Sequence, residues 1–188
     1  MTKQNEALEK ISEKQQEIAS DWFHYWEDFS SFSTWPFWFH VVMFVVPLIV
    51  LYFKLDRKKA LELGFFGLNI HVWFAYFDTL GTRQGFWTYP FQMLPFLPNS
   101  VGLDASLVPV LFILLYQWVK NHNKNYYFYA FLLSLILSFG LKWFFVSMNL
   151  FKFHMGANYF HLFLTYLVIL GLSKWIVDLF LHFQKEAQ

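Results

Sequence analysis

Cysteine is absent from the 188 residues of this chain, and charged residues make up only 14% of it. Without cysteine the chain has no disulfide framework, no thiolate zinc site and no cysteine nucleophile. The chain is 57% hydrophobic and 24% aromatic, and its apolar residues come in long blocks. These charged residues are too few to cover the surface of a soluble protein. The composition therefore indicates an integral membrane protein. The net charge of +1 gives no indication of nucleic-acid binding.

Familiar catalytic motifs are missing as well. The sequence contains no Gly-x-Ser-x-Gly, no His-Glu-x-x-His and no glycine-rich phosphate loop. His154 and His161 lack the i, i+4 spacing of two metal-ligating histidines on one helix face. His71 and Asp78 lie two helical turns apart like an orienting pair for a general base, but no nucleophile is near them. We therefore expect no catalytic residue, metal or cofactor, and an enzyme is the least favoured hypothesis.

Residues 1–33 are predicted to form an N-terminal arm. They begin polar and become aromatic, with Leu8, Ile11, Ile18 and Trp22 at heptad-like spacing that Gln15 interrupts. This pattern is typical of an amphipathic helix. The helix is either a solvated arm whose aromatic end rests among lipid headgroups or a docking helix for a partner. No signal-peptide pattern precedes the first apolar run, so we expect that run to be a retained anchor.

Residues 34–188 are predicted to form a transmembrane domain. Five apolar runs lie at about 36–53, 60–80, 104–119, 126–151 and 155–177. The expected fold is an all-α membrane bundle of about five transmembrane helices with an N-terminal amphipathic helix. The third run leaves an alternative open, because ~16 residues give about 24 Å of helix against a hydrocarbon core of ~30 Å. If that run were re-entrant, the C-terminus would change sides.

Basic residues predict the orientation. Seven lie in the loops 54–59 and 120–124 and at position 185, on one side of the expected bundle. Five lie on the other side, and three of these are in the distant arm. Because lysine and arginine near the spans favour the cytoplasmic face, the C-terminus is predicted to be cytoplasmic. The N-terminus and the loop 81–102 are then predicted to lie outside.

A proline-rich loop separates the second and third apolar runs. It contains Trp87, Tyr89 and Pro90, and further prolines follow at 95 and 98. Such a sequence favours an extended, rigid segment rather than a helix. We interpret it as a lid over the outer end of the bundle.

Polar side chains of several spans are predicted to meet beneath this lid. Projection at 100° per residue places them on inward faces, in the outer half of the bundle. The expected intramembrane polar cluster comprises Asp78, Asp104, Lys142, Asn149, Asn158, His161 and His71. On the span 60–80, Gly64, Gly67 and Ala75 form a stripe of small residues typical of close helix packing.

Lys142 is the member of this cluster that most needs a partner. A lysine ~13 Å from the nearest helix end can snorkel only partly, and its charge costs ~2.5 kcal/mol or more unless paired. Asp78 and Asp104 are the acids at suitable depth, so we expect Lys142 to pair with one of them. At the predicted cytoplasmic end of the span 60–80, Glu62 is predicted to pair with Lys58, four residues before it.

The middle third of the chain contains Asp78-Thr79-Leu80, Gly85-Phe86-Trp87-Thr88-Tyr89-Pro90, Pro95, Asp104, Pro109 and Tyr116-Gln117. In these residues it resembles a family of uncharacterised small multi-span inner-membrane proteins of endospore-forming Firmicutes. In that family an Asp precedes a Trp-x-Tyr-Pro loop, and Tyr-Gln ends the next span. The arm is not part of the family pattern, and Ser138 to Lys142 stand where the family has an acidic Glu-Pro. The resemblance implies a bacterial cytoplasmic membrane, or a spore membrane, and no particular activity.

Two functional hypotheses follow from the sequence. The first is a non-catalytic subunit or accessory of a membrane assembly, which contacts a protein partner or a second copy of itself through the arm or the outer loop. The second is a small transporter or channel component lined by the polar cluster. The cluster itself is either functional or a hydrogen-bond network that locks the helices in register.

Overall fold

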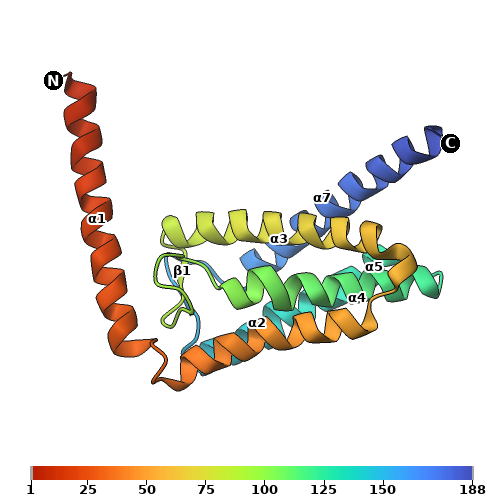
Figure 1. Ribbon diagram of the computed structural model, residues 1–188, viewed down its shortest axis with the longest axis horizontal. Helices are drawn as coiled ribbons and strands as arrows, with labels where there is room; N and C mark the ends of the chain where they lie inside the picture. Colours follow the sequence, from red (N-terminus) through yellow and green to blue (C-terminus); the bar gives the residue numbers. More distant parts are fainter. Residues whose placement is uncertain (1, 188) are drawn as a thin grey trace.

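The computed structural model describes residues 2–187 and is an all-α bundle (Figure 1). Five helical stretches in this range are long and apolar enough to cross a membrane: Trp35–Lys54, Arg57–Arg83, Leu103–Asn121, Tyr126–Ser147 and Tyr159–Glu186. This arrangement confirms the fold class expected from the sequence.

The helices of the bundle are α2 (Trp35–Lys54), α3 (Ala60–Arg83), α4 (Val108–Asn121), α5 (Tyr126–Leu135), α6 (Lys142–Ser147) and α7 (Tyr159–Glu186). A 3₁₀ turn, η1 (Arg57–Lys59), precedes α3. Two π-helical turns extend other helices: η2 (Leu103–Leu107) leads into α4, and η3 (Ile136–Leu141) joins α5 to α6. With η2 included, the third stretch has 19 residues and spans about 28 Å, close to a hydrocarbon core.

Helix α3 packs against both α4 and α7 and supplies much of the core. Phe66, Ile70 and Phe74 of α3 are buried, and the ring of Phe74 meets Tyr166 of α7 edge to face. The two glycines of the predicted small-residue stripe differ. A Cβ on Gly67 would lie 2.3 Å from Ile113 Cδ1 of α4, whereas a Cβ on Gly64 would have nothing within 4 Å. Close packing therefore occurs at Gly67, while Ala75 is half-buried.

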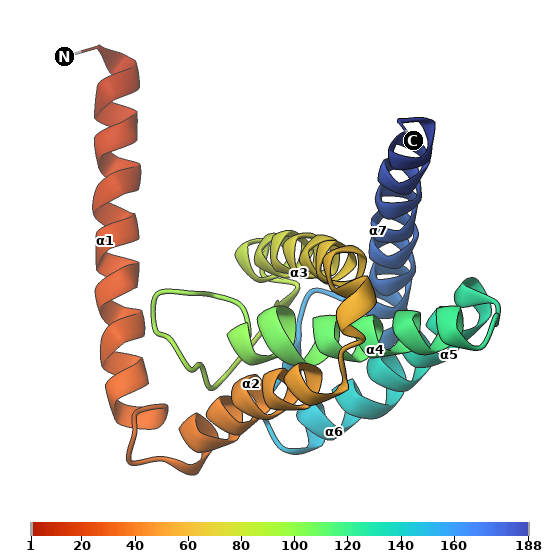
Figure 2. The same ribbon diagram turned by 45° about the vertical axis from the view of Figure 1, so that its right-hand side comes forward.

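Helix α1 (Lys3–Phe29) stands away from the bundle and runs across the direction of α2, α3 and α4 (Figures 1 and 2). None of its residues is buried by the rest of the chain. Its base is attached to the loop after α3, because Trp26 Nε1 donates to the Gln92 carbonyl at 3.1 Å. A second, longer bond runs from the Gln92 N–H to Ser30 Oγ at 3.4 Å.

A short β-ladder closes the end of the bundle that carries this loop, here called the loop end. Strand β1 (Trp87–Thr88) pairs antiparallel with β2 (Lys152–Phe153), with Trp87 opposite Phe153. The His154 N–H extends the contact by donating to the Phe86 carbonyl at 2.8 Å. The loop after α3 is thereby fixed to the connection between α6 and α7.

Glu62 lies at the opposite end of the bundle, and its predicted partner is wrong. Instead of Lys58, Glu62 forms an ion pair with Lys120 of α4 and accepts from the Tyr116 hydroxyl at 2.7 Å. Lys58 precedes α3 in the turn η1, where its backbone N–H bonds to Asp56. The helical i, i+4 spacing therefore does not apply to this pair.

Candidate functional site

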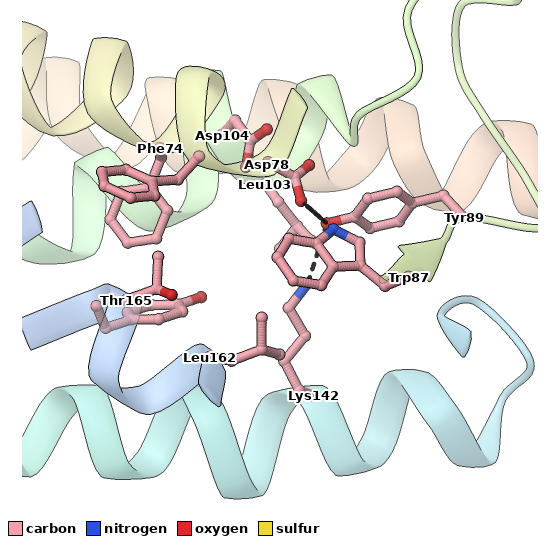
Figure 3. Close-up of a pocket in the computed structure, with 11 residues that line it drawn as sticks. Phe74, Asp78, Trp87, Tyr89, Leu103, Asp104, Lys142, Leu162 and Thr165 are labelled. Atoms are coloured by element: carbon pink, nitrogen blue, oxygen red, sulfur yellow. Dashed lines mark hydrogen bonds between the residues drawn. The ribbon is translucent and has the colours of Figure 1, made fainter. Parts of the chain in front are cut away.

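A buried polar cluster lies at the loop end of the bundle, centred on Asp78 of α3 (Figure 3). The Asp78 side chain is 8% exposed, and one of its oxygens, Oδ1, accepts two hydrogen bonds from the loop. Trp87 Nε1 donates to it at 2.7 Å, and the Tyr89 hydroxyl donates at 2.9 Å. Both donors belong to the loop, so Asp78 fixes the loop against α3.

Tyr89 connects Asp78 to Lys142. The Lys142 amine donates to the Tyr89 hydroxyl at 3.1 Å, and it lies 4.0 Å from the centre of the Phe151 ring. The expected pairing of Lys142 with an aspartate is therefore indirect: the phenol stands between amine and carboxylate. Burial, and then the charge of Asp78, raise the pKa of Tyr89 well above its usual value. The phenol thus remains protonated and can donate to Asp78 while it accepts from Lys142.

Asp104 brings a second carboxyl group to the cluster. It belongs to the π-helical turn η2 and is 4% exposed. Its Oδ2 accepts from Asn99 Nδ2 at 2.9 Å, and its backbone carbonyl accepts from His71 Nδ1 at 2.9 Å. The Asp104 and Asp78 carboxyl groups lie beside each other (Figure 3), and both residues line the same small cavity.

Close backbone approach allows Trp87 to reach Asp78. A Cβ on Gly81 would lie 1.9 Å from Cζ2 of the Trp87 ring, so only glycine leaves room for the indole. The loop is bonded on its other side as well, where Thr88 Oγ1 and His154 Nε2 are 2.9 Å apart. The Trp-x-Tyr segment is therefore held from both sides.

A cavity of about 30 Å³ lies within the cluster. Asp78, Asp104 and Lys142 line it together with Thr165 and Tyr166 of α7. A cavity of this size has room for about one water molecule. An outer groove of about 490 Å³ lies on the other side of Phe77, Trp87 and Thr165, because these three side chains line both spaces.

Three predicted members of the cluster lie elsewhere. Asn149 is exposed and has φ 57°, in a turn after α6, because the helix ends at Ser147. Asn158 caps α7 by accepting from the backbone N–H groups of Phe160 and His161. His161 is exposed and lines the outer groove. A projection at 100° per residue does not hold for Asn149 and Asn158, because both stand outside the helices.

Several contributors were not predicted as donors or acceptors. Trp87 and Tyr89 were assigned to a lid, and they are the donors to Asp78, while the neighbouring Pro90 is half-buried. A buried indole N–H or phenol O–H usually finds a hydrogen-bond partner, and Asp78 was an acid without a predicted donor, so these contacts could have been predicted. Asn99 had no such signal, because its bond to Asp104 depends on the path of the loop.

No group of three or more His, Asp and Glu side chains in residues 2–187 is arranged to hold a metal ion. Comparison of the chain with family models, curated proteins and solved structures gives no match. The site is therefore interpreted from its own geometry, as a buried cluster of two carboxyl groups and one amine that fixes the loop after α3.

Proposed function

We propose that this chain is a non-catalytic accessory subunit of a membrane assembly, and that a partner segment docks between α1 and the loop that the polar cluster holds. The observation that carries the proposal is the unpartnered apolar stripe of α1. Leu8, Ile11 and Ile18 are 63%, 55% and 54% exposed. Monomeric proteins rarely leave such stripes uncovered, so they mark contact surfaces.

A cleft of about 590 Å³ between the arm and the loop supports this position for the partner. Ile18 and Trp22 of α1 line one wall, and Tyr89, Pro95 and Phe96 line the other. Tyr89 is also part of the polar cluster, so the cluster fixes one wall of the cleft. A wall that is already rigid loses little conformational entropy when a partner binds.

Charge indicates the chemistry of the partner. The arm carries seven acidic residues and three lysines within residues 3–28. Complementary charge favours association and selects partners. The partner segment is therefore an amphipathic helix with an apolar face flanked by basic residues.

Site-specific photo-crosslinking in the native membrane tests this proposal. A photoreactive amino acid at Ile11 or Ile18 is expected to yield a stoichiometric adduct with a different protein, whose crosslinked peptide is basic and amphipathic. The same probe at Glu13, on the polar face of α1, is the matched control and should yield much less. Adducts formed only between two copies of this chain, or with lipid alone, would refute an accessory role.

The proposal also covers the orientation of the chain across the membrane and the identity of that membrane. We place the loop end outside and the C-terminus in the cytoplasm of a bacterial cell, with the cytoplasmic or spore membrane as the location, in line with the basic loops and the resemblance. Because the chain has no cysteine, single cysteines at Ser33 and Ala187 give clean reporters. In intact cells a membrane-impermeant maleimide should label the first and spare the second. The reverse pattern would refute the orientation.

A small transporter is the second candidate, and one observation favours it. Asp78 Oδ2 is buried and has no hydrogen-bond partner within residues 2–187, beside a small cavity. Unsatisfied charged groups inside a membrane often mark an ion path. Against this, the cavity of about 30 Å³ is separated from the larger groove by packed side chains. Proton or cation flux into liposomes that contain the purified protein would favour the transporter.

A further inference from the structure

The charges of the buried cluster do not balance. Asp78, Asp104 and Lys142 are 8%, 4% and 4% exposed, so all three are removed from water. If all were ionised, two negative charges would face one positive charge. A net charge left in a low-dielectric interior is costly, and ionisable groups there become neutral instead. One additional proton makes the cluster neutral.

Hydrogen bonding points to the same proton. With both carboxyl groups ionised, Asp78 Oδ2 has no partner in the described part of the chain, although Oδ1 has two. The Asp104 carboxyl lies beside it and lines the same cavity (Figure 3). Two carboxylates cannot bond to each other, because neither has a donor. One proton between them supplies the missing donor and satisfies Oδ2.

The remaining titratable groups around the two acids do not supply that proton. Lys142 donates to the Tyr89 hydroxyl, and the hydroxyl proton of Tyr89 is directed to Asp78 Oδ1. His71 bonds to the backbone carbonyl of Asp104 rather than to its carboxyl group. Tyr166 of α7 lines the same cavity. None of these groups is bonded to Asp78 Oδ2.

From this geometry we infer that Asp78 and Asp104 form a proton-binding site that holds one exchangeable proton between their carboxyl groups at neutral pH. The cavity of about 30 Å³ beside them accommodates the water through which this proton exchanges. Trp87 and Thr165 line both that cavity and the outer groove. The inference goes beyond the accessory role and does not depend on it.

Infrared spectroscopy of the purified protein in lipid nanodiscs at neutral pH tests the inference on the wild-type chain. The expected result is one carbonyl-stretch band of a protonated carboxylic acid that shifts in D₂O. Labelling aspartate with ¹³C at the side-chain carboxyl should shift the same band, which assigns it to aspartate. Exposed aspartates are ionised at this pH and give no such band. Its absence from the folded wild-type protein would overturn the inference.

Variants distinguish a shared proton from a merely structural cluster. Asp104→Asn leaves one acid facing Lys142, a neutral pair, so the band should be lost while the protein still folds. Lys142→Met removes the balancing charge, so a second protonated carboxyl should appear. Asp21→Asn, on the exposed face of α1, is the matched control and should change nothing. A band that Na⁺ abolishes and choline does not would identify a cation site and refute the proton site.

Discussion

The Tyr89 hydroxyl is the single atom that joins Asp78 of α3 to Lys142 of α6, and Tyr89→Phe removes only that atom. The hydroxyl donates to Asp78 at 2.9 Å and accepts from Lys142 at 3.1 Å. Each hydrogen bond to a charged partner contributes about 1.5–3 kcal/mol. Trp87 remains bonded to Asp78 in the variant. We therefore expect a loss of about 3 kcal/mol in the free energy of unfolding, roughly a 10²-fold change in the equilibrium constant.

Reversible unfolding in mixed micelles measures this loss. Tyr127→Phe is the matched control, because Tyr127 lies on α5 with its side chain 62% exposed, and it should change the free energy by less than about 0.5 kcal/mol. Hydrogen exchange localises the effect: the backbone amides of residues 86–92 should exchange faster in Tyr89→Phe and not in the control. Equal stability of the two variants would refute the reasoning, because it would mean that Lys142 can reach Asp78 without the phenol.

Four further variants probe the cluster and the packing of α3 by the same unfolding assay. Gly81→Ala should lose about 1–3 kcal/mol by displacing the Trp87 ring, which stands 1.9 Å from the new Cβ; full stability would show that the indole has room. Gly67→Leu should destabilise the chain by a similar amount, while Gly64→Leu, facing open space, should not; equal effects would contradict the packing. The folded chain is expected to hold one proton that the unfolded chain has released near neutral pH. The free energy of unfolding should therefore fall by about 1.4 kcal/mol per pH unit as pH rises, and Asp104→Asn should abolish this slope.

The bundle could be predicted because its signals are local. Apolar runs of about membrane length predict spans whatever the tertiary contacts are, and residues 2–187 contain five such helices. The third span appeared short because the predicted run 104–119 leaves out both ends of the helical stretch, which runs from Leu103 to Asn121. The two-residue ladder between β1 and β2 had no signal, because so short a strand shows no alternation.

The cluster was predictable only in part, and the reason is geometric. Asp78 and Lys142 lie within helices, so placing them on inward faces was sound. Asn158 lies just before α7 and Asn149 just after α6, where a helical projection has no meaning. The bridging role of Tyr89 could not be derived from spacing, since it depends on how an irregular loop folds back over α3.

Stability alone does not explain why the cluster is polar. Replacing a buried ionic group by well-packed apolar side chains is often neutral or stabilising. The backbone also departs from regular α-helix at both charged members outside α3: Asp104 lies inside the π-helical turn η2, and Lys142 directly follows η3. Such turns interrupt the regular i→i−4 bonding and occur frequently at functional sites. The two π-helical turns bring a second acid and its counter-charge to Asp78. The function of the resulting arrangement, a fixed loop over a shared proton, therefore explains these turns better than a gain in the free energy of unfolding does.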